Sequence, residues 1–583
     1  MPRQRYFYSL LLCSIFLFVK APGAFGMTNP DGMPSPFIGY EPRSIVVKFG
    51  QAALGRINRL LTPSGRTGIL AVDQLGRDYG VAAIKRQFPG ARKRFLRGRT
   101  IDLSGWHKMY FQADVDIENV VAAYKKLGDV VDAQPIGIHA VQLIPNDSFY
   151  GIQWHLNQID ATKAWDFETG NAEIIVAVLD SGVRWFHQDL GGNDAVFFEP
   201  PGFNDDISDL QGADGNMWIN GIEANGVFGV DDDGNGFADD LIGWDFVEIP
   251  VLSALLLCNP YEDCLVVDND PRDYQGHGTH VAGIVGALNN NGYGVSSPAG
   301  GWGTGNRAPG GNGVKIMALR IGWADRTAPP YGPLGYVNMS FAAQALRYAA
   351  DNGARIANAS WGSSNSGGLG DAVDYFLAAG GLIVHAGGND GADAPDYLDS
   401  RGDVVNVAAT DQNDCKASFS NYGNWVDIAA PGVAMTSTWH DYTNPSGEYV
   451  ISMSGTSMAS PLAVSVAALI WSQNPLWTAQ QVKMKLYDSS NRIDDLICNS
   501  GFIGQLGSGR VNAYLAVGSC EGDFGGNGVA DGSDLADLVN AYGCTSDCSP
   551  YDVTYDGIVD SGDLDVFVKD YGRTGCPGGA AAP

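Results

Sequence analysis

The sequence predicts an α/β body with a parallel sheet flanked by helices, preceded by a small α+β module and followed by a small helical module. Short apolar strands alternate with helices through the middle of the chain. An early segment is basic in an otherwise acidic protein, and an acidic loop followed by a helix repeats near the C-terminus. The 583 residues are also too many for one ordinary domain.

Residues 1–26 have the pattern of a secretory signal peptide. Two arginines precede an apolar run at 6–19, and small residues follow it. We expect cleavage between Ala24 and Met27, with an uncleaved anchor as the minor alternative, and hence a secreted or cell-surface protein. No later stretch is long enough to cross a membrane, so no membrane span is expected once the signal peptide is removed.

The net charge argues against one class of partner, and the cysteine count indicates the cellular compartment. The formal net charge of −29 argues against a nucleic-acid partner, because phosphates would be repelled. Eight cysteines remain after the signal peptide, an even number that suits disulfides in an oxidising compartment. Cys258 and Cys264 are close enough to close a surface loop, and Cys415 and Cys498 are a second candidate pair. The tail holds Cys520, Cys544, Cys548 and Cys576, whose connectivity the sequence leaves open.

Residues 41–143 are predicted to form a separate α+β module. Fourteen basic and four acidic side chains give residues 41–110 a charge of +10, so the rest of the chain carries −39. Strands are expected at 44–49 and 109–113, and an amphipathic helix at 117–127. A basic module ahead of an acidic body predicts an intramolecular partner held partly by charge, with an ordinary accessory domain as the alternative.

The central body shows the alternation of strands and helices that a parallel sheet requires. From residue 173 an almost continuous apolar run ends in Asp180, which is the pattern of a strand buried on both faces. A carboxylate at the carboxyl end of such a strand lines the ligand crevice, although it could also only cap the next turn. Further strands are expected at 314–320, 382–386 and 404–409, a strand followed by a turn at 356–362, and helices at 341–352 and 371–379.

The motif Gly276-His277-Gly278-Thr279-His280 is predicted to begin a helix at its first histidine. Its glycines allow another stretch of backbone to approach closely. Two histidines three residues apart could suggest a metal pair, but the His-Glu-x-x-His pattern of metallopeptidases is absent. One histidine with a distant acid and a distant serine fits a general base better.

Ser457 precedes an apolar, helix-like run at 463–470. Pro461 fits the first turn of a helix, so Ser457 is expected at the helix N-terminus. The unpaired N–H groups and the positive dipole end there would stabilise an oxyanion formed by attack of this serine. The alternative is a serine that only caps a buried helix.

Three segments in this order resemble the signatures of the subtilisin-like serine peptidases. They are Asp180-Ser181-Gly182, Gly276-His277-Gly278-Thr279-His280 and Gly455-Thr456-Ser457-Met458-Ala459-Ser460-Pro461. The resemblance covers residues 147–518 and implies a subtilisin-like catalytic domain. It makes Ser457 the nucleophile, His277 the general base and then acid, and Asp180 the residue that orients the imidazole.

The same resemblance implies how a peptide substrate lies. Ser360-Trp361-Gly362 would be the strand on which the substrate pairs as an added antiparallel strand, which gives affinity with little demand on sequence. Ala386-Gly387-Gly388 would line the opposite side of the primary pocket, although the family often has alanine where this chain has Gly387-Gly388. Asn389 would stabilise the oxyanion through its side-chain amide, together with the Ser457 N–H.

Acidic segments of the body are predicted calcium sites, and no organic cofactor is expected. Residues 231–240 alternate oxygen ligands around a glycine turn, which suits Ca²⁺, with a solvated acidic loop as the alternative. The candidate ligands there are Asp231, Asp233, Asn235 and Asp239. The family resemblance adds Asp268 with Asp270 as a second site, and Asp147 with Asp189 and Asn290 as a third.

Residues 520–577 contain a repeated loop followed by a helix. The loops at 523–534 and 552–563 align in register, with a glycine at the sixth position and ligands at the first, fifth, ninth and twelfth. The candidate ligands are Asp523, Asn527, Asp531 and Asp534 in the first loop, and Asp552, Thr554, Asp556, Asp560 and Asp563 in the second. The repeat resembles a dockerin-type module, which implies a docking partner protein. A calcium-stabilised stalk or sorting tag is the alternative.

Together these features predict a secreted serine endopeptidase that hydrolyses peptide bonds through an acyl-enzyme. By family resemblance, residues 41–143 are an inhibitory propeptide that the enzyme removes from itself near residues 138–146. The expected partners are protein or peptide substrates, the chain's own propeptide and a docking protein. A catalytically silent scaffold for calcium-dependent docking is one alternative, against which the complete triad counts, and a hydrolase of esters is another.

Overall fold

The computed structural model describes most of the chain. The described residues are 37–60, 66–91, 93–96, 99–113, 115–139, 143–192, 215–259, 262–303, 313–325, 335–440, 449–518, 520, 522–524, 529–545, 548 and 550–571. The predicted signal peptide, Asn527 and Cys576 lie outside them. The chain divides into two compact units, the larger comprising 141–519 with 544–558, and the smaller comprising 1–140, 520–543 and 559–583.

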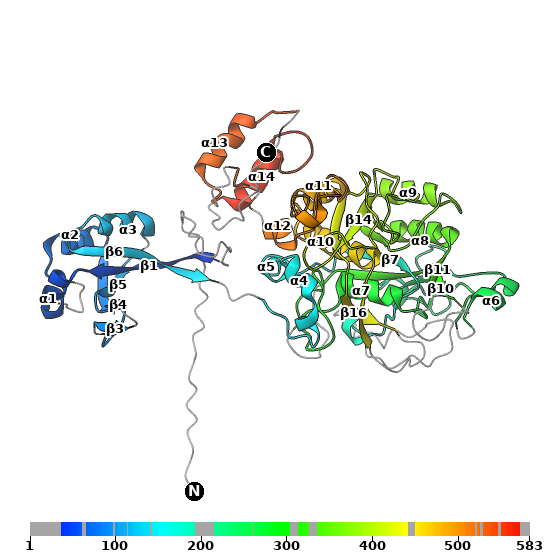
Figure 1. Cartoon of the computed structure of the whole chain (residues 1–583), viewed down its shortest axis with the longest axis horizontal. Helices are drawn as coiled ribbons and strands as arrows, with labels where there is room; N and C mark the ends of the chain where they lie inside the picture. Colours follow the sequence, from blue (N-terminus) through cyan, green and yellow to red (C-terminus); the bar gives the residue numbers. More distant parts are fainter. Residues whose placement is uncertain are drawn as a thin grey trace, which may run out of the picture. The chain divides into compact units, whose positions relative to one another are not determined.

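The larger unit is built on a seven-stranded sheet (Figure 1). The strands run in the order β15-β14-β13-β12-β7-β9-β8, and every neighbouring pair is parallel. They are β7 (Ile175–Asp180), β8 (Gly243–Asp245), β9 (Lys315–Arg320), β12 (Ile356–Ala359), β13 (Leu382–Ala386), β14 (Val405–Thr410) and β15 (Ile428–Pro431). The predicted parallel sheet is therefore confirmed.

Helices cover both faces of this sheet. On one face Val176 and Val178 of β7 share a core with α7 (His277–Gly286) and α10 (Thr456–Gln473). On the other face Ala177 and Leu179 share a core with α8 (Met339–Asp351) and α9 (Leu369–Ala378). Alternate side chains of β7 thus enter opposite cores, which confirms the prediction of a central strand buried on both sides.

Helix α10 begins at Thr456, and Pro461 is its sixth residue. The expectation that Pro461 lies in the first turn is therefore wrong, although Ser457 does lie in that turn. A proline inside a helix lacks the N–H that would reach the carbonyl four residues earlier, here that of Ser457. The Ser360 hydroxyl donates to this carbonyl instead, at 3.0 Å, which is why the helix tolerates the proline.

Smaller elements complete the unit. Two antiparallel hairpins pair β10 (Gly322–Ala324) with β11 (Gly335–Val337) and β16 (Met435–Trp439) with β17 (Tyr449–Met453). The remaining helices are α4 (Trp154–Gln158), α5 (Ala161–Ala164), α6 (Val251–Leu257), α11 (Ala479–Asp488) and α12 (Ala513–Gly518). Within the described part of the chain, no helix combines the length and the apolar character that a membrane crossing needs.

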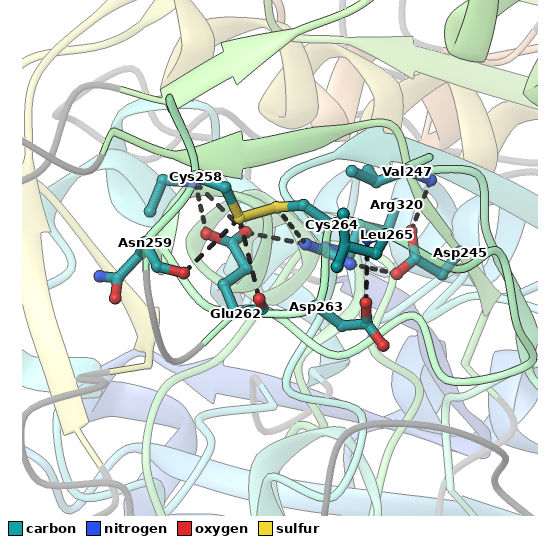
Figure 2. The surroundings of a disulfide bond; sticks show 10 residues. Asp245, Val247, Cys258, Asn259, Glu262, Asp263, Cys264, Leu265 and Arg320 are labelled. Atoms are coloured by element: carbon teal, nitrogen blue, oxygen red, sulfur yellow. Dashed lines mark hydrogen bonds and ion pairs between the residues drawn. A yellow bond between two sulfur atoms is a disulfide. The ribbon is translucent and has the colours of Figure 1, made fainter. Parts of the chain in front are cut away.

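Two of the expected cysteine pairs are disulfides in this unit, Cys258–Cys264 and Cys415–Cys498, and the tail adds Cys544–Cys548. Figure 2 shows that the first closes a loop over Arg320, the last residue of β9. Glu262 in this loop accepts a hydrogen bond from the Arg320 guanidinium at 2.8 Å. Arg320 is the register partner of Asp180. The loop closed by the disulfide therefore contacts the sheet beside the predicted catalytic acid.

In the smaller unit, the N-terminal segment is the predicted α+β module. Its four-stranded sheet has the order β2-β5-β1-β6 and is antiparallel. The strands are β1 (Phe37–Phe49), β2 (Val81–Arg86), β5 (Trp106–Phe111) and β6 (Val130–His139), with a short hairpin of β3 (Arg94–Leu96) and β4 (Arg99–Ile101). Helices α1 (Gln51–Leu60), α2 (Leu70–Asp78) and α3 (Ile117–Lys125) supply apolar residues to a core of its own.

The tail contributes the two predicted helices that follow the repeated loops, α13 (Gly532–Ala541) and α14 (Ser561–Asp570). Both begin in the same way. The N-cap aspartate accepts a backbone N–H from the first turn, and the aspartate three residues later accepts the N–H of the N-cap residue. The sequence repeat is therefore also a repeat of local structure.

Candidate active site

Asp180 is the last residue of β7, at the carboxyl edge of the sheet. Its side chain is buried, and Oδ1 accepts hydrogen bonds from the Ser181 N–H and from His277 Nδ1, each at 2.8 Å. The second contact joins an acid and an imidazole that lie 97 residues apart in the sequence. With Nδ1–H directed at the carboxylate, Nε2 is the nitrogen left to accept a proton.

Glycines bring α7 against the turn that follows Asp180. A Cβ atom on Gly278 would lie 2.0 Å from the Gly182 carbonyl oxygen and 2.9 Å from the Asp180 Cβ. Gly276, the N-cap residue of α7, has a φ of 104°, in the region that favours glycine. The glycines of the histidine motif are thus needed for His277 to reach Asp180.

Asp273 is a buried carboxylate that links the two motifs and that sequence reasoning missed. Its Oδ1 accepts hydrogen bonds from the Ser181 hydroxyl (2.9 Å) and the Gly276 N–H (2.8 Å). Its Oδ2 accepts the N–H (3.0 Å) and the hydroxyl (2.6 Å) of Thr279 in α7. Because Asp273 lies three residues before Gly276, the N-cap of α7, no capping pattern in the sequence pointed to it.

The surroundings of His277 favour its protonated form. Burial by itself works to lower the pKa of the imidazole, but the charge and hydrogen bond of Asp180, together with the charge of Asp273, raise that pKa above its usual value of 6.5. The side chain remains 22% exposed. His277 can therefore accept a proton, hold it as a cation beside Asp180, and still be reached by a substrate.

Ser457 is the second residue of α10 and is partly exposed. Its hydroxyl donates to the Ser360 carbonyl at 3.1 Å. Strands β12 and β7 are parallel neighbours with Ala359 opposite Leu179, so Ser360 and Asp180 follow at the same edge of the sheet. The sheet register therefore brings the serine, through Ser360, to the edge where the acid lies.

Asn389 and the Ser457 N–H approach a common point beside Gly455. Asn389 Oδ1 accepts the N–H (2.9 Å) and the hydroxyl (3.1 Å) of Thr456, so the amide is held by its oxygen and Nδ2 stays available as a donor. A Cβ atom on Gly455 would lie 3.7 Å from Asn389 Nδ2 and 3.7 Å from Ser457 N. Two donors flanking one space are what a developing oxyanion requires.

The predicted substrate walls differ in exposure. Ser360 and Trp361 are buried, whereas Gly362 is exposed and leaves its backbone open to a peptide. On the other wall, a Cβ atom on Gly387 would lie 3.2 Å from the ring of Trp425. Trp425 therefore occupies the space that an alanine would use there. Gly388 has a φ of 93°, which favours glycine on its own account.

Comparison with known proteins agrees with this geometry. Residues 171–509 match the family described as Subtilase family, Peptidase_S8. The chain belongs to the subtilase family. Thermitase from Thermoactinomyces vulgaris is 32% identical over 375 residues, which are 64% of this chain and 99% of thermitase. The thermophilic serine proteinase of Bacillus sp. (strain AK1) is 31% identical over 404 residues (69% and 76%), and Subtilisin Savinase from Lederbergia lenta is 37% identical over 247 residues (42% and 79%). The protein is a serine endopeptidase of this family.

In this subtilase, Asp147 and Asp189 meet at one loop. Asp147 accepts the N–H groups of Asn290 and Asn291 at 2.9 Å each, and Asp189 accepts the side-chain amide of Asn291 at 2.9 Å. The Asn290 amide donates to the Gly303 carbonyl instead. Asn291, which sequence reasoning did not select, thus lies between the two carboxylates. Oxygen donors of this kind suit Ca²⁺.

A further carboxylate, that of Glu223, lies beside the acidic loop of the subtilase. Single oxygens of Glu223, Asp231 and Asp233 all lie within 4.8 Å of one another. The Asn235 amide donates to Asp233 at 3.1 Å, while Asp239 accepts a backbone N–H from another part of the loop. Three carboxylates this close repel one another unless a cation or donors offset their charge, so the set fits Ca²⁺. Glu223 precedes the acidic run and had no motif of its own.

Asp268 and Asp270 have different surroundings. Asp270 forms a buried ion pair with Arg272 at 2.5 Å and accepts the Trp185 indole N–H at 3.2 Å. Burial, the largest cause, raises the pKa of Asp268 to about 6. Because Arg272 already balances the charge of Asp270, this pair fits a calcium ion less well than the loop around Glu223 does.

The tail carboxylates serve as helix caps. Asp531 and Asp560 are N-caps, and Asp534 and Asp563 accept their N–H groups at 2.9 Å and 2.8 Å. Asp552 accepts the N–H of the glycine five residues later at 2.8 Å. Of the remaining candidates, Thr554 is buried, Asp523 is partly buried and Asp556 is exposed. The second loop therefore turns as the repeat predicts, and carboxylates lie at both helix starts.

Proposed function

We propose that this subtilase is a secreted endopeptidase in which Ser457 attacks the scissile carbonyl, His277 accepts the serine proton and Asp180 orients the imidazole. The observation that carries the proposal is the 2.8 Å contact between His277 Nδ1 and Asp180 Oδ1. It keeps one proton on Nδ1 and leaves Nε2 as the base, and the carboxylate stabilises the imidazolium that forms. The glycines and Asp273 described above hold this pair in place.

The chemistry then proceeds in two halves. Attack by Ser457 Oγ moves a proton to His277 and creates a tetrahedral oxyanion, which the Asn389 amide and the Ser457 N–H stabilise. The imidazolium gives its proton to the leaving amine as the carbon–nitrogen bond breaks, and an acyl-enzyme remains. His277 next takes a proton from water, which attacks the ester. The departing Ser457 oxygen regains its proton from the same ring.

A serine-directed label tests the nucleophile. We expect a fluorophosphonate probe to modify the secreted protein and the same protein to cleave casein, and we expect Ser457→Ala to lose both. Ser454→Ala is the matched control, since this exposed serine lies three residues earlier and outside α10. Equal labelling of the Ser457→Ala protein would reject the nucleophile. An intact protein that neither takes the label nor cleaves casein would favour the alternative of a silent scaffold.

We infer that residues 1–26 are the signal peptide and that residues 41–143 are a propeptide. The support is that the α+β segment has its own apolar core and a basic composition ahead of an acidic enzyme. N-terminal sequencing of secreted protein tests both points. The wild type is expected to begin between residues 138 and 146, and Ser457→Ala is expected to retain the module and begin near Met27. Identical N-termini in the two proteins would contradict self-processing.

We also propose that calcium stabilises the enzyme. Asp147, Asp189 and Asn291 would hold one ion through their side-chain oxygen atoms. The loop around Glu223 would hold a second between carboxylates that otherwise repel one another. Such an ion supplies charge balance and fixes loops, and it takes no part in bond cleavage. The test is calcium binding to the chelated, inhibitor-blocked protein by calorimetry, with Glu223→Gln expected to lose one site.

For the C-terminal module we propose calcium-dependent docking to a partner protein. The two capped helices and their repeated acidic loops support a paired structure, as the dockerin resemblance implies. Capture of one defined partner by the full chain in calcium, lost on chelation and lost when Asp563 is changed to Ala, is the expected result. Calcium binding without any partner would favour a stalk or sorting tag.

A further inference from the structure

His385 is a fully buried histidine in β13 whose two ring nitrogens both face hydrogen-bond acceptors. Nδ1 lies 3.0 Å from Asp399 Oδ1, and Nε2 lies 2.8 Å from the Trp361 carbonyl oxygen. Asp396 Oδ2 is 3.6 Å from Nε2. A carbonyl and an ionised carboxylate can only accept, so both ring nitrogens must carry hydrogen for both contacts to be hydrogen bonds. The geometry describes an imidazolium.

The Trp361 carbonyl belongs to the wall Ser360–Gly362, on which the substrate is proposed to pair. The Trp361 indole N–H donates to the Leu179 carbonyl at 2.8 Å, directly before the catalytic Asp180. Trp361 is therefore held at two points, by β7 through its side chain and by His385 through its backbone. Of these two, only the bond from His385 depends on a proton that titrates.

The carboxylates around His385 hold the same wall from its far end. Asp396 accepts the N–H and the hydroxyl of Ser363, each at 2.6 Å, immediately after Gly362. Asp396 and Asp399 also accept each other's backbone N–H groups, at 3.1 Å and 3.2 Å, which fixes their turn. The turn thus contacts the wall on both sides of Gly362. On one side the contact runs through His385 to Trp361, and on the other it is made with Ser363.

The groups that face the ring are few. Asp396 and Asp399 are the charged groups that act on it from the turn, and Trp361 contributes its carbonyl and its ring, whose centroid is 6.3 Å away. In the sheet, the register partners of His385 are Ala359 in β12 and Asn406 in β14, which are uncharged. A cation is therefore paired with two anions inside the domain, and no opposing cation acts on it from these described elements.

We propose that His385 is a positioning residue of the peptidase. As an imidazolium it fixes the Trp361 carbonyl. When it loses its proton, the wall Ser360–Gly362 loosens and KM for peptides rises. This inference rests on the proposed function, because it uses the substrate-pairing role of that wall. It assigns His385 no contact with the reacting atoms.

The direction of the pH effect follows from the surroundings. Burial works to lower the pKa of His385, but the hydrogen bond to Asp399 and the charges of Asp396 and Asp399 raise it above 6.5. When the ring becomes neutral, its one hydrogen stays on Nδ1, because the carboxylate is the stronger acceptor. The Nε2 lone pair then faces the Trp361 carbonyl and repels it. The loss therefore falls on the alkaline side, whereas His277 must be neutral to act as a base.

Kinetics across the neutral and alkaline range test the proposal. For the wild type we expect KM for a chromogenic peptide to rise several-fold on the alkaline side while kcat stays nearly constant. Asp399→Asn keeps an acceptor but removes a charge, so the rise should move to lower pH. His385→Gln removes the ionisation and should flatten the KM profile. His155→Gln is the control, because it replaces another buried histidine, in α4, and should leave the profile unchanged.

A second measurement does not depend on catalysis. Hydrogen exchange of the segment 360–363, corrected for the intrinsic effect of pH, is expected to accelerate on the alkaline side in the wild type, earlier in Asp399→Asn and not in His385→Gln. A KM rise and an exchange step that stay at the same pH in both variants would overturn the proposal, whatever happens to the melting temperature. If the chain fails to cleave peptides but the exchange step moves as described, the proposed function is wrong and the role of His385 in the wall stands.

Discussion

Ser360 and Ser457 exchange two hydrogen bonds, between the residue that follows β12 and the first turn of α10. The Ser457 hydroxyl donates to the Ser360 carbonyl at 3.1 Å, and the Ser360 hydroxyl donates to the Ser457 carbonyl at 3.0 Å. The second bond compensates for Pro461, which has no N–H for that carbonyl. A single pair of serines thus joins the proposed substrate wall to the helix that carries the proposed nucleophile.

Replacing Ser360 with Ala is predicted to weaken both stability and catalysis. The Ser457 carbonyl would lose its partner, at a cost of about 1–3 kcal/mol, and the start of α10 would be less well fixed. We expect a lower midpoint in urea unfolding and a reduced kcat in the same variant. Ser364→Ala, in the exposed loop after the wall, should change neither quantity. A fully active and stable Ser360→Ala protein would show that the Ser457 carbonyl finds another donor.

The pH dependence of activity should reflect His277. Since Asp180 raises the pKa of His277 above 6.5 and the ring must be neutral to accept a proton, the acidic limb of kcat/KM is expected to have its midpoint above 6.5. Asp180→Asn removes the charge, so the limb should shift to lower pH while kcat falls about 10⁴-fold. Steady-state kinetics with a chromogenic peptide measure both effects. An unmoved limb would mean that another group sets the profile.

Gly455 is predicted to keep the oxyanion space open. A methyl group there would lie 3.7 Å from both donors, and the extended backbone of Gly455 accepts an alanine without strain. Gly455→Ala should therefore fold normally yet lose about 10²–10³-fold in kcat. Gly501→Ala, at an exposed glycine with open space around it, is the control. Circular dichroism confirms folding before the rates are compared. Wild-type kcat in Gly455→Ala would place the oxyanion elsewhere.

Chelation is predicted to lower the melting temperature of the inhibitor-blocked enzyme, because an ion bound only to the folded state stabilises it. At a free calcium concentration of about 100 times the Kd, one site contributes about 2.7 kcal/mol. Glu223→Gln should reduce the calcium-dependent shift, whereas Asp371→Asn, at an exposed acid in α9, should not. Differential scanning calorimetry in calcium and in chelator measures the shift. Equal melting temperatures in the two buffers would exclude the calcium assignments.

The two disulfides of the larger unit should differ in their contribution to stability. Cys258 and Cys264 are 6 residues apart and Cys415 and Cys498 are 83 apart, so loop entropy predicts about 2 kcal/mol for the first and about 4.5 kcal/mol for the second. Urea unfolding of the two double Cys→Ser variants measures the difference. Removal of the first pair should also lower kcat, since its loop holds Glu262 on Arg320 beside Asp180 (Figure 2). A larger loss for the short loop would show that this packing outweighs the loop entropy.

The sequence by itself determined the sheet and the motifs. The apolar run ending in Asp180, the glycines around His277 and the helix after Ser457 each depend on local rules: strand burial, close approach and helix starts. The α+β module and the repeated tail loops could also be predicted, because a contrast in charge and a repeated pattern are visible along the chain. These elements formed close to the predicted boundaries, as β13 shows at Leu382–Ala386.

Only the tertiary structure decided which groups meet. Asp273, Glu223 and Asn291 carry no motif, and their roles depend on loops that approach from elsewhere in the chain. The tolerance of Pro461 inside α10 depends on the Ser360 hydroxyl, 97 residues before the Ser457 carbonyl that it reaches. The charge of His385 depends on a carbonyl and two carboxylates from other segments. Hydrogen bonds and ion pairs act over a few ångströms of space, whatever the separation in sequence, so these partnerships exist only once the sheet has set its register.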